Sequence, residues 1–507
     1  MIQLAGLNAL VILTMLLGAI NLINPFISKE DTKIRSFFLI GTSIFFLCNI
    51  LLLDYLFLTG IESSFTLFSF SKYSIAFKLE PLGMIFLNLL AVLWIAALLY
   101  TIKFLAINSI TNSSRFLFFL NCCILSGCLI ALSGNLFTMF VFYEILTMFT
   151  IPLIAHSPNK KTSVNLLKYL KILMMSALTL LLPAIVIIYS STGSGDFTQG
   201  GFIKGYFKDS YAIILLLMMI FGTAKSALFP FQGWLPSAMI ASYPVSALLH
   251  AVVVVKTGLF CTFKIMMYVF GLKYLQELFM SYNWLILFPI ITIIYSSWQV
   301  LRFNEIKTIL AYSTINQLSI ALLGAFLLSP KGMQGAVMHM ISHSFTKICL
   351  FYAAGNIYTI KNSYTLTQLV GARDTLPKTS FVMLISGLSL IGIPPFGGFI
   401  SKFYILMAAA SQDNYLVIAT LLLSSIFTAV YVLKILIFIY FPSTKANSPI
   451  VSEEKSYSAD ILENNSNKVR SEKNLPSFMI ISIFLCLGGV VGFFYIQLWV
   501  TSFLNFM

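Results

Sequence analysis

The sequence predicts an all-α polytopic membrane protein with about 14 transmembrane helices, two inverted five-helix repeats, and breaks in helices seven and twelve. Three observations carry this prediction: the composition, the length of the apolar stretches, and the glycines and prolines inside two of them. Of the 507 residues, 59% are hydrophobic and 9% are charged, and the mean hydropathy is +0.93. A soluble domain carries about 25% charged residues, so this composition is typical of a membrane protein.

About 14 stretches reach the roughly 20 apolar residues that a membrane-spanning helix needs. They are centred near residues 14, 47, 93, 125, 145, 180, 218, 257, 291, 317, 346, 393, 428 and 488. Helices one to three occupy residues 1–110. The first stretch, Met1 to Asn24, has no positively charged start and no small-residue cleavage pattern, so we expect a retained helix rather than a signal peptide.

Two of the stretches are interrupted by glycines and prolines in a similar way. The first contains Lys225 and continues as Phe229-Pro230-Phe-Gln-Gly233-Trp-Leu-Pro236; the second runs Gly392-Ile-Pro394-Pro395-Phe-Gly397-Gly398 before Lys402. Proline removes a backbone donor and glycine lowers helix propensity, so both helices are expected to break inside the membrane. Interrupted spans at corresponding positions are typical of repeat transporters. We therefore expect two repeats, helices four to eight in residues 111–270 and helices nine to thirteen in residues 271–441.

The charge and polarity of the chain predict its last two segments and its orientation in the membrane. Residues 442–476 are polar and mixed in charge, which predicts a flexible cytoplasmic loop, and residues 477–507 form helix fourteen. The net charge of +14 does not indicate nucleic-acid binding, because the Lys and Arg residues lie in short loops between apolar spans. They are more frequent after odd-numbered helices, so both termini are predicted on the non-cytoplasmic side.

Four charged residues interrupt otherwise apolar stretches: Glu144, Lys225, Lys256 and Lys402. A charge at the bilayer centre costs about 2.5–3.5 kcal/mol on insertion scales, so several of them imply a compensating polar interior. That interior is the best candidate for an ion or proton path. Burial disfavours the charged form of a lysine and a nearby carboxylate favours it, so a movement between such groups would load or release a proton.

The sequence offers no cofactor or metal site. All seven cysteines fall in apolar spans, as expected for buried thiols, and no C-x-x-C pair, zinc spacing, phosphate-binding glycine loop or Ser-His-Asp order occurs. His339 and His343, one helical turn apart, could face a metal or a haem, but no second histidine pair matches them. Lysines near predicted helix ends are expected to extend to the membrane interface, as is His156 beside a loop proline. These lysines are Lys168, Lys171, Lys264 and Lys434.

Several motifs resemble the antiporter-like proton-conducting subunits shared by respiratory complex I, membrane-bound hydrogenases and Mrp-type Na+/H+ antiporters. The most specific runs from Gly-Trp-Leu-Pro-Ser-Ala at 233 to His250, and continues into Val-Lys-Thr-Gly-Leu-Phe at 255–260. The others are Glu305-Ile-Lys-Thr-Ile-Leu-Ala-Tyr-Ser-Thr-Ile-Asn-Gln317, His343-Ser-Phe-Thr-Lys347 and Gly392 to Lys402. The resemblance covers about residues 80–440 and implies fourteen helices, with inverted repeats and broken helices seven and twelve.

The resemblance also implies roles for the buried charges. Glu144 matches the glutamate of the fifth helix, Lys225 the seventh-helix lysine that pairs with it, Lys256 the central lysine of the eighth helix, and Lys402 the exit residue of the twelfth. His250, His339, His343 and Lys347 match the polar axis between them.

The motifs support two interpretations of the type of subunit. Lys402 and the Gly-Phe-Ile-Ser-Lys-Phe run favour an Mrp D-type subunit, whereas the eighth-helix motif is closest to the largest complex I subtype. The function expected is therefore proton translocation in a multisubunit monovalent-cation/proton antiporter of a bacterial inner membrane. The alternative is a proton-pumping subunit of complex I, or of a related hydrogenase. Either way the partners would be other hydrophobic subunits, with no redox chemistry or cofactor in this chain. A self-contained transporter for an organic substrate is disfavoured, because Phe, Pro and Gly line the breaks.

Overall fold

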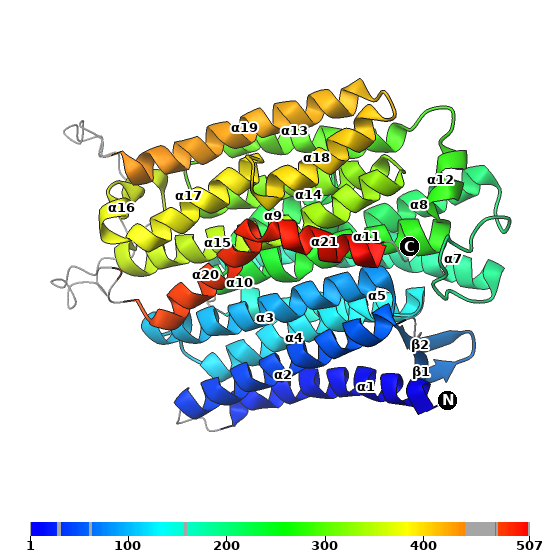
Figure 1. The fold of residues 1–507 in the computed structure, drawn as a ribbon, viewed down its shortest axis with the longest axis horizontal. Coiled ribbons are helices and arrows are strands. Elements are labelled where there is room, and N and C mark those ends of the chain that lie inside the picture. Colours follow the sequence, from blue (N-terminus) through cyan, green and yellow to red (C-terminus); the bar gives the residue numbers. More distant parts are fainter. Residues whose placement is uncertain are drawn as a thin grey trace.

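The protein is a bundle of long, roughly parallel helices (Figure 1). The computed structural model describes residues 2–27, 32–59, 63–156, 160–362, 364–441, 472 and 475–504. Its helices are α1 Ile2–Ile23, α2 Thr32–Leu58, α3 Pro81–Ile107, α4 Ser113–Ala131, α5 Leu136–Ile154, α6 Lys160–Ser176, α7 Leu182–Thr192, α8 Asp209–Gly222, α9 Trp234–Ser237, α10 Tyr243–Ala247, α11 Val254–Lys264, α12 Leu272–Leu278, α13 Leu287–Arg302, α14 Ile306–Phe326, α15 Pro330–Lys361, α16 Ala372–Thr375, α17 Pro377–Ile391, α18 Gly397–Ala410, α19 Tyr415–Tyr440, α20 Ser477–Val491 and α21 Phe493–Leu504. The described residues also form two strands, β1 Ser64–Phe70 and β2 Tyr73–Lys78.

The helices account for an integral membrane protein. Within the described residues, ten helices are long and apolar enough to cross a membrane, and α20 with α21, bent by 65°, would form one more. Two of the ten contain π-helical turns, Ala177–Leu181 between α6 and α7 and Leu248–Val252 between α10 and α11. If α8 with α9, α15, and α17 with α18 also cross, the described chain has fourteen crossing units, which is consistent with the number predicted.

A β-hairpin between α2 and α3 was not predicted. Its strands pair antiparallel from Ser64 with Lys78 to Phe70 with Tyr73. The Gly134 N–H donates to the Ala76 carbonyl (2.8 Å), and the Phe197 N–H donates to the Gly134 carbonyl (3.0 Å). The hairpin, residues 132–135, residues 193–208 and α12 thus gather at one end of the bundle, called the hairpin face below (right-hand end of Figure 1). Short apolar runs of this kind cannot be told from helix by periodicity alone.

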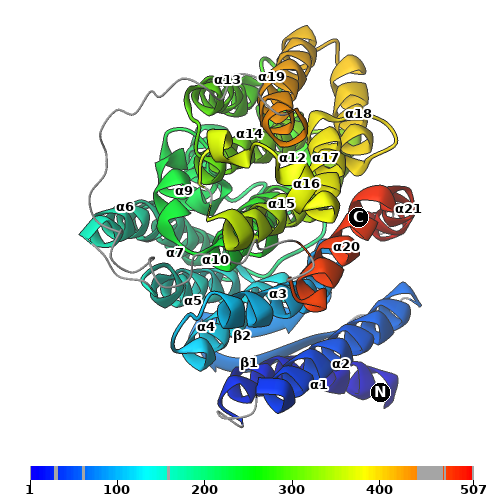
Figure 2. The same cartoon turned by 90° about the vertical axis from the view of Figure 1, so that its left-hand side faces the viewer.

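Helix α15 lies at the centre of the bundle. Viewed along the helices, α1 and α2 lie at one edge beside α3 and α4, and α13, α18 and α19 lie at the other (Figure 2). Between these edges α15 packs against α10, α14, α17, α18 and α20. Residues on its inner faces therefore contact helices from both of the predicted repeats.

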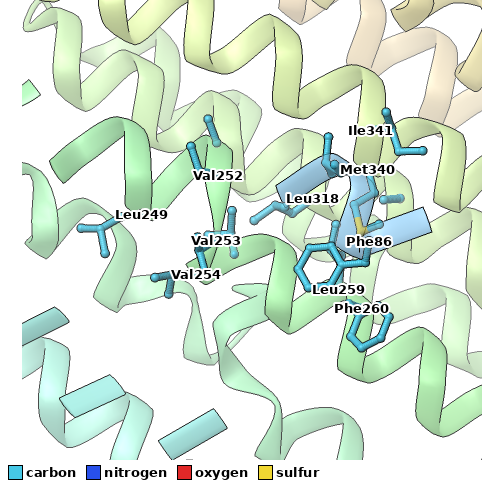
Figure 3. Close-up of a cluster of buried hydrophobic side chains, with 14 of the residues drawn as sticks. Phe86, Leu249, Val252, Val253, Val254, Leu259, Phe260, Leu318, Met340 and Ile341 are labelled. Carbon is cyan, nitrogen blue, oxygen red and sulfur yellow. The ribbon is translucent and has the colours of Figure 1, made fainter. Parts of the chain in front are cut away.

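The centre is packed mainly with apolar side chains. Phe86 of α3 stacks on Phe260 of α11 with ring centres 4.7 Å apart, and Leu318 of α14 and Met340 of α15 belong to the same buried cluster (Figure 3). Polar groups embedded in such a cluster are removed from bulk water, so their interactions with one another are stronger than at a surface.

The predicted flexible loop, residues 442–476, lies outside the described residues except at Glu472, Leu475 and Pro476. The Glu472 carboxylate accepts hydrogen bonds from the backbone N–H groups of Lys378 (2.9 Å) and Thr379 (2.8 Å), at the start of α17. A carboxylate is favourable there because the first N–H groups of a helix have no partner within the helix.

Candidate functional site

Both interrupted spans contain a break at the predicted position. Helix α8 ends at Gly222, and the chain continues through a short 3-10 turn, Ala224–Ser226, before α9. Pro230 and Gly233 lie in this connection. The second span is interrupted between α17, which ends at Ile391, and α18, which begins at Gly397.

Glycine is required at the second break. Gly392 has a φ of +95°, a conformation that residues with a Cβ rarely adopt. A Cβ on Gly398 would lie 1.8 Å from the Ser389 carbonyl oxygen, so only glycine lets α18 approach α17 this closely. Pro394 and Pro395 lie between these positions and cannot donate a backbone hydrogen bond.

Lys402 caps the broken helix α17. Its Nζ donates to the carbonyl oxygens of Leu390 (3.0 Å) and Ile391 (2.8 Å), and the Ser425 hydroxyl lies 3.4 Å away. The last carbonyls of a helix have no partner within it and carry a partial negative charge, so they stabilise a buried cation without a carboxylate.

Lys225 is fully buried at the first break and is held by Tyr143 of α5. Its Nζ donates to the Tyr143 carbonyl oxygen (2.6 Å) and lies 3.1 Å from the centre of the Tyr143 ring, while its backbone N–H donates to the Tyr143 hydroxyl (3.2 Å). A tyrosine ring attracts a cation through its negative face. Lys225 is thus stabilised by one residue of the neighbouring helix.

Glu144 is next to Tyr143 in sequence, but it forms no ion pair with Lys225. The two ion pairs among the described residues, with N–O distances within 4.0 Å, are Lys204–Glu277 and Lys264–Glu80. Both Glu144 carboxylate oxygens are buried and accept no hydrogen bond from described protein groups. The two charges still interact electrostatically. The structure therefore places Glu144 near Lys225 and leaves its carboxylate free to change partners.

A line of buried polar and titratable side chains runs between the two halves. Lys256 Nζ lies 2.5 Å from His343 Nδ1. The rings of His343 and His339 are parallel within 5°, with centres 6.2 Å apart. His339 Nδ1 lies 2.9 Å from the Ser401 hydroxyl, and Ser401 precedes Lys402. The line thus runs from α11 across α15 to the broken helix α18.

His250 and Lys347 flank this line. Lys347 Nζ donates to the Leu310 carbonyl oxygen (3.0 Å) and to the Ser313 hydroxyl. His250 is fully buried with its ring 5.1 Å from that of Phe351, and neither ring nitrogen has a hydrogen-bond partner among the described protein groups. Buried polar atoms without a protein partner are normally satisfied by water.

A polar cavity of about 360 Å³ opens at the end of the bundle opposite the hairpin face. Lys307, at the start of α14, lines it; its Nζ donates to the Ala241 carbonyl oxygen (2.6 Å) and lies 4.3 Å from the Tyr243 ring centre. Tyr243 begins α10, which leads directly to His250. His156 also lines the cavity, as expected for an interfacial residue. Lys307 belongs to the motif that begins at Glu305, but a lysine at a helix start carries no signal of burial, so its role could not be predicted from the sequence.

The expectation for Lys264 was wrong. It was predicted to extend to the membrane interface, yet it is fully buried and its Nζ lies 2.9 Å from Oε2 of Glu80. The chain continues beyond α11 as a π-helix, Ile265–Phe270, so the position is not a helix end. Lys168 and Lys171 are exposed, as expected, and Lys434 is half-buried with its Nζ 2.9 Å from the side-chain oxygen of Asn304.

The fold and the buried lysines and histidines define a polytopic membrane protein with titratable groups in its interior. Residues 133–428 match the family described as NADH:quinone oxidoreductase/Mrp antiporter, TM, and the chain belongs to this family. The resemblance read from the motifs is therefore confirmed.

Relatives and solved structures agree with this assignment. The "Putative antiporter subunit mnhA2" of Staphylococcus haemolyticus (strain JCSC1435) is 30% identical over 396 residues, which cover 71% of this chain and 47% of the relative. The protein of the same name from Staphylococcus saprophyticus is 30% identical over 384 residues, which again cover 71% of this chain and 47% of the relative. This chain thus spans about half the length of these curated relatives. They carry the name mnhA2, and the D-type assignment stays a prediction.

Two solved structures share the fold. A chain of the Mrp complex from Dietzia sp. DQ12-45-1b superposes with a TM-score of 0.80 at 19% identity, covering 98% of this chain and 52% of that one. A chain of the membrane-bound sulfane sulfur reductase, an archaeal respiratory membrane complex, superposes with a TM-score of 0.80 at 21% identity. The match covers 97% of this chain and 96% of that one. The predicted fold class is confirmed by these matches.

Proposed function

We propose that this chain is a proton-translocating subunit of a multisubunit, Mrp-type monovalent-cation/proton antiporter, with Na+ as the expected cation. The observation that carries the proposal is the contact between Lys256 and His343 (2.5 Å), since it joins α11 of the first predicted repeat to α15 of the second. Each predicted repeat also contains a broken helix with its own buried lysine, Lys225 or Lys402. A purely structural subunit would gain nothing from unpaired lysines at depth, because each costs about 2.5–3.5 kcal/mol to insert.

The proposed path uses the side chains in spatial order. A proton enters from the cavity beside Lys307 and reaches Lys256 by way of His250 and Lys347. Lys256 then passes it to Nδ1 of His343. His339 and the Ser401 hydroxyl carry it to Lys402. An imidazole accepts a proton at one ring nitrogen and releases one from the other, so it can relay protons between two lysines.

Glu144 and Lys225 form the proposed switch of the first half. The Glu144 carboxylate has no hydrogen-bond partner among the described protein groups, and Lys225 is bound by Tyr143 rather than by Glu144. A small displacement of α5 relative to the break changes the Glu144–Lys225 separation, and with it the preference of Lys225 for its charged form.

The proposal extends to the partners, the membrane and the orientation of the chain. The chain would work with other hydrophobic membrane subunits, in a bacterial inner membrane, with protons and a monovalent cation as its cargo. Both ends of the described chain lie toward the hairpin face in Figure 1. The charge distribution of the loops supports the non-cytoplasmic side for that face. Residues 111–270 and 271–441 are proposed as inverted repeats, with one broken helix in each.

A second candidate function is favoured by one observation. This chain and the chain of the respiratory sulfane sulfur reductase cover each other almost completely, 97% and 96%, whereas it covers 52% of the Mrp chain. A proton-pumping subunit of a respiratory complex, such as complex I or a hydrogenase, therefore stays the alternative.

Copurification separates the two candidates. An affinity-tagged full-length chain, extracted from its own membranes in mild detergent, is expected to bring small hydrophobic subunits without flavin or iron–sulfur centres. Bound flavin or iron–sulfur absorbance in the purified assembly would instead identify the respiratory alternative. Full transport activity of the chain alone would contradict both assignments.

Water should reach the second break. In a variant whose native cysteines are replaced, Ser401→Cys is expected to react with a small water-soluble thiol reagent at least about 10-fold faster than Leu421→Cys, because helix breaks are wetted by polar cavities. Ser401 and Leu421 are buried to the same extent, 0% and 2% exposed, so exposure alone does not separate them. Equal protection at both positions would remove Lys402 from the path.

A further inference from the structure

A second buried carboxylate–lysine pair lies outside the path described above. Glu80, immediately before α3, is 3% exposed, and Lys264, at the end of α11, is fully buried; Nζ and Oε2 are 2.9 Å apart. We propose that Glu80 and Lys264 exchange a proton with each other and connect the first half of the bundle with the hairpin face. This inference rests on the proposed function, since it adds a proton-binding site to the same transport.

Apart from the contact between its two members, the pair has little hydrogen bonding. Lys264 Nζ also donates to the carbonyl oxygen of Ser133 (2.5 Å), whereas no described protein group other than Lys264 donates to the carboxylate of Glu80. A buried ion pair stabilises a fold only when its geometry is good and further hydrogen bonds satisfy the remaining lone pairs. The lone pairs of Glu80 that do not contact Lys264 therefore remain available to a proton or to water.

The pair is close to the first broken helix. The hydroxyls of Thr223 and Thr262 are 3.0 Å apart, which joins the turn before Lys225 to α11 within one helical turn of Lys264. The Cys261 thiol interacts electrostatically with both Lys225 and Lys264. The backbone at Lys225 and Ser226 also abuts Gly258 of α11, where a Cβ would lie 2.2 Å from the Ser226 nitrogen. A change at Lys225 is thus transmitted directly to the helix that carries Lys264.

The pair is buried close to the hairpin face, behind Phe197. Phe197 separates Lys264 from the partly exposed Lys78 of β2: Lys264 Nζ lies 4.4 Å from the Phe197 ring centre, and Lys78 Nζ donates to the Phe197 carbonyl oxygen (3.3 Å). Glu80 follows Lys78 by two positions and interacts with both lysines. The hydroxyl of Tyr268 interacts electrostatically with the same carboxylate.

The charged and titratable groups around Glu80 are therefore Lys78, Lys264 and Tyr268, with Cys261 beside Lys264. When the proton leaves Nζ of Lys264 it binds a Glu80 oxygen, which converts an ammonium and a carboxylate into an amine and a carboxylic acid. The net charge of the pair does not change, so the step avoids creating a buried charge. The carboxylic acid then releases its proton to water at the hairpin face, which leaves a carboxylate beside a neutral amine. A proton supplied by Lys225, on the other side of the Thr223–Thr262 contact, returns Lys264 to its charged form and restores the ion pair.

Two variants of the full-length chain in its membrane assembly test the proposal by dye-monitored proton flux, normalised to protein amount. Lys264→Arg retains the positive charge beside Glu80, but a guanidinium does not lose its proton in proteins. The double variant Glu80→Gln with Lys264→Met removes both charges, and neutral replacements of a buried pair are often tolerated or stabilising. Both are expected to lower flux about 100-fold at near-normal abundance, the loss typical of removing a positioned proton-transfer group.

The exposed pair on the same face is the matched control. Lys204 and Glu277 lie 2.6 Å apart with side chains 60% and 55% exposed, and Lys204→Met with Glu277→Gln is expected to leave flux unchanged. Wild-type flux per protein in either Lys264→Arg or the Glu80–Lys264 double variant would show that the pair only holds the helices together. Lys225→Ala, measured in parallel, separates the proposed function from the role of the Glu80–Lys264 pair. If Lys225→Ala loses flux while the Glu80–Lys264 variants keep it, the proposed function stands and only the role of this pair is refuted.

Discussion

Replacing Lys225 with alanine is expected to lower proton or Na+ flux by about 100-fold, the scale on which positioned proton-transfer groups contribute. Lys225 is fully buried at the first break, and its ammonium group is held by the carbonyl and ring of Tyr143. The substitution removes the cation whose charge state is switched and leaves Glu144 without the charge that balances it. The measurement is flux into everted membrane vesicles under an imposed pH gradient.

Abundance must be measured alongside flux in this experiment. An uncompensated buried charge destabilises a fold, so the Lys225→Ala protein is expected to be less abundant, and Glu144→Gln in the same chain should restore its level without restoring flux. The exposed Lys171 of α6 provides the control, because Lys171→Ala removes the same charge from a neighbouring helix. Normal flux in Lys225→Ala at wild-type protein level would contradict the role given to Lys225.

Replacing His343 with alanine is expected to lower flux by about 100-fold and to change its dependence on pH, because His343 is the group that Lys256 contacts. Imidazole is the side chain that changes charge near neutral pH, so its loss should remove the part of the flux profile that follows that titration. The flux of purified assemblies in vesicles is measured between weakly acidic and weakly alkaline pH.

Two further variants separate proton transfer from packing in this prediction. His343→Gln keeps an oxygen that can accept from Lys256 but cannot titrate, and it should behave like His343→Ala. Phe345→Ala removes a buried ring that packs near Gly489 on the other side of α15, so it should lower abundance and leave the profile unchanged. If the surviving flux of His343→Ala kept the wild-type profile, His343 would be structural.

The sequence by itself determined the class of the protein and its two helix breaks. Apolar length and composition are properties of the chain alone, and the cost of inserting Glu144 or Lys402 into a bilayer does not depend on which helix is the neighbour. The same holds for Pro394 and Gly398, which interrupt a helix through local backbone chemistry. Individual buried charges and breaks could therefore be read before any contact was known.

Only the tertiary structure decided which of these groups meet. Lys256 and His343 are 87 positions apart, and their contact depends on how α11 packs on α15. The expected direct pairing of Glu144 with Lys225 is replaced by the bond from Lys225 to Tyr143. From the sequence, Lys264 was expected at the membrane interface because its distance from the next loop is short, yet Phe197 packs on it and Glu80 lies 2.9 Å away. Contacts between distant segments depend on packing of the whole chain, and local patterns carry no record of them.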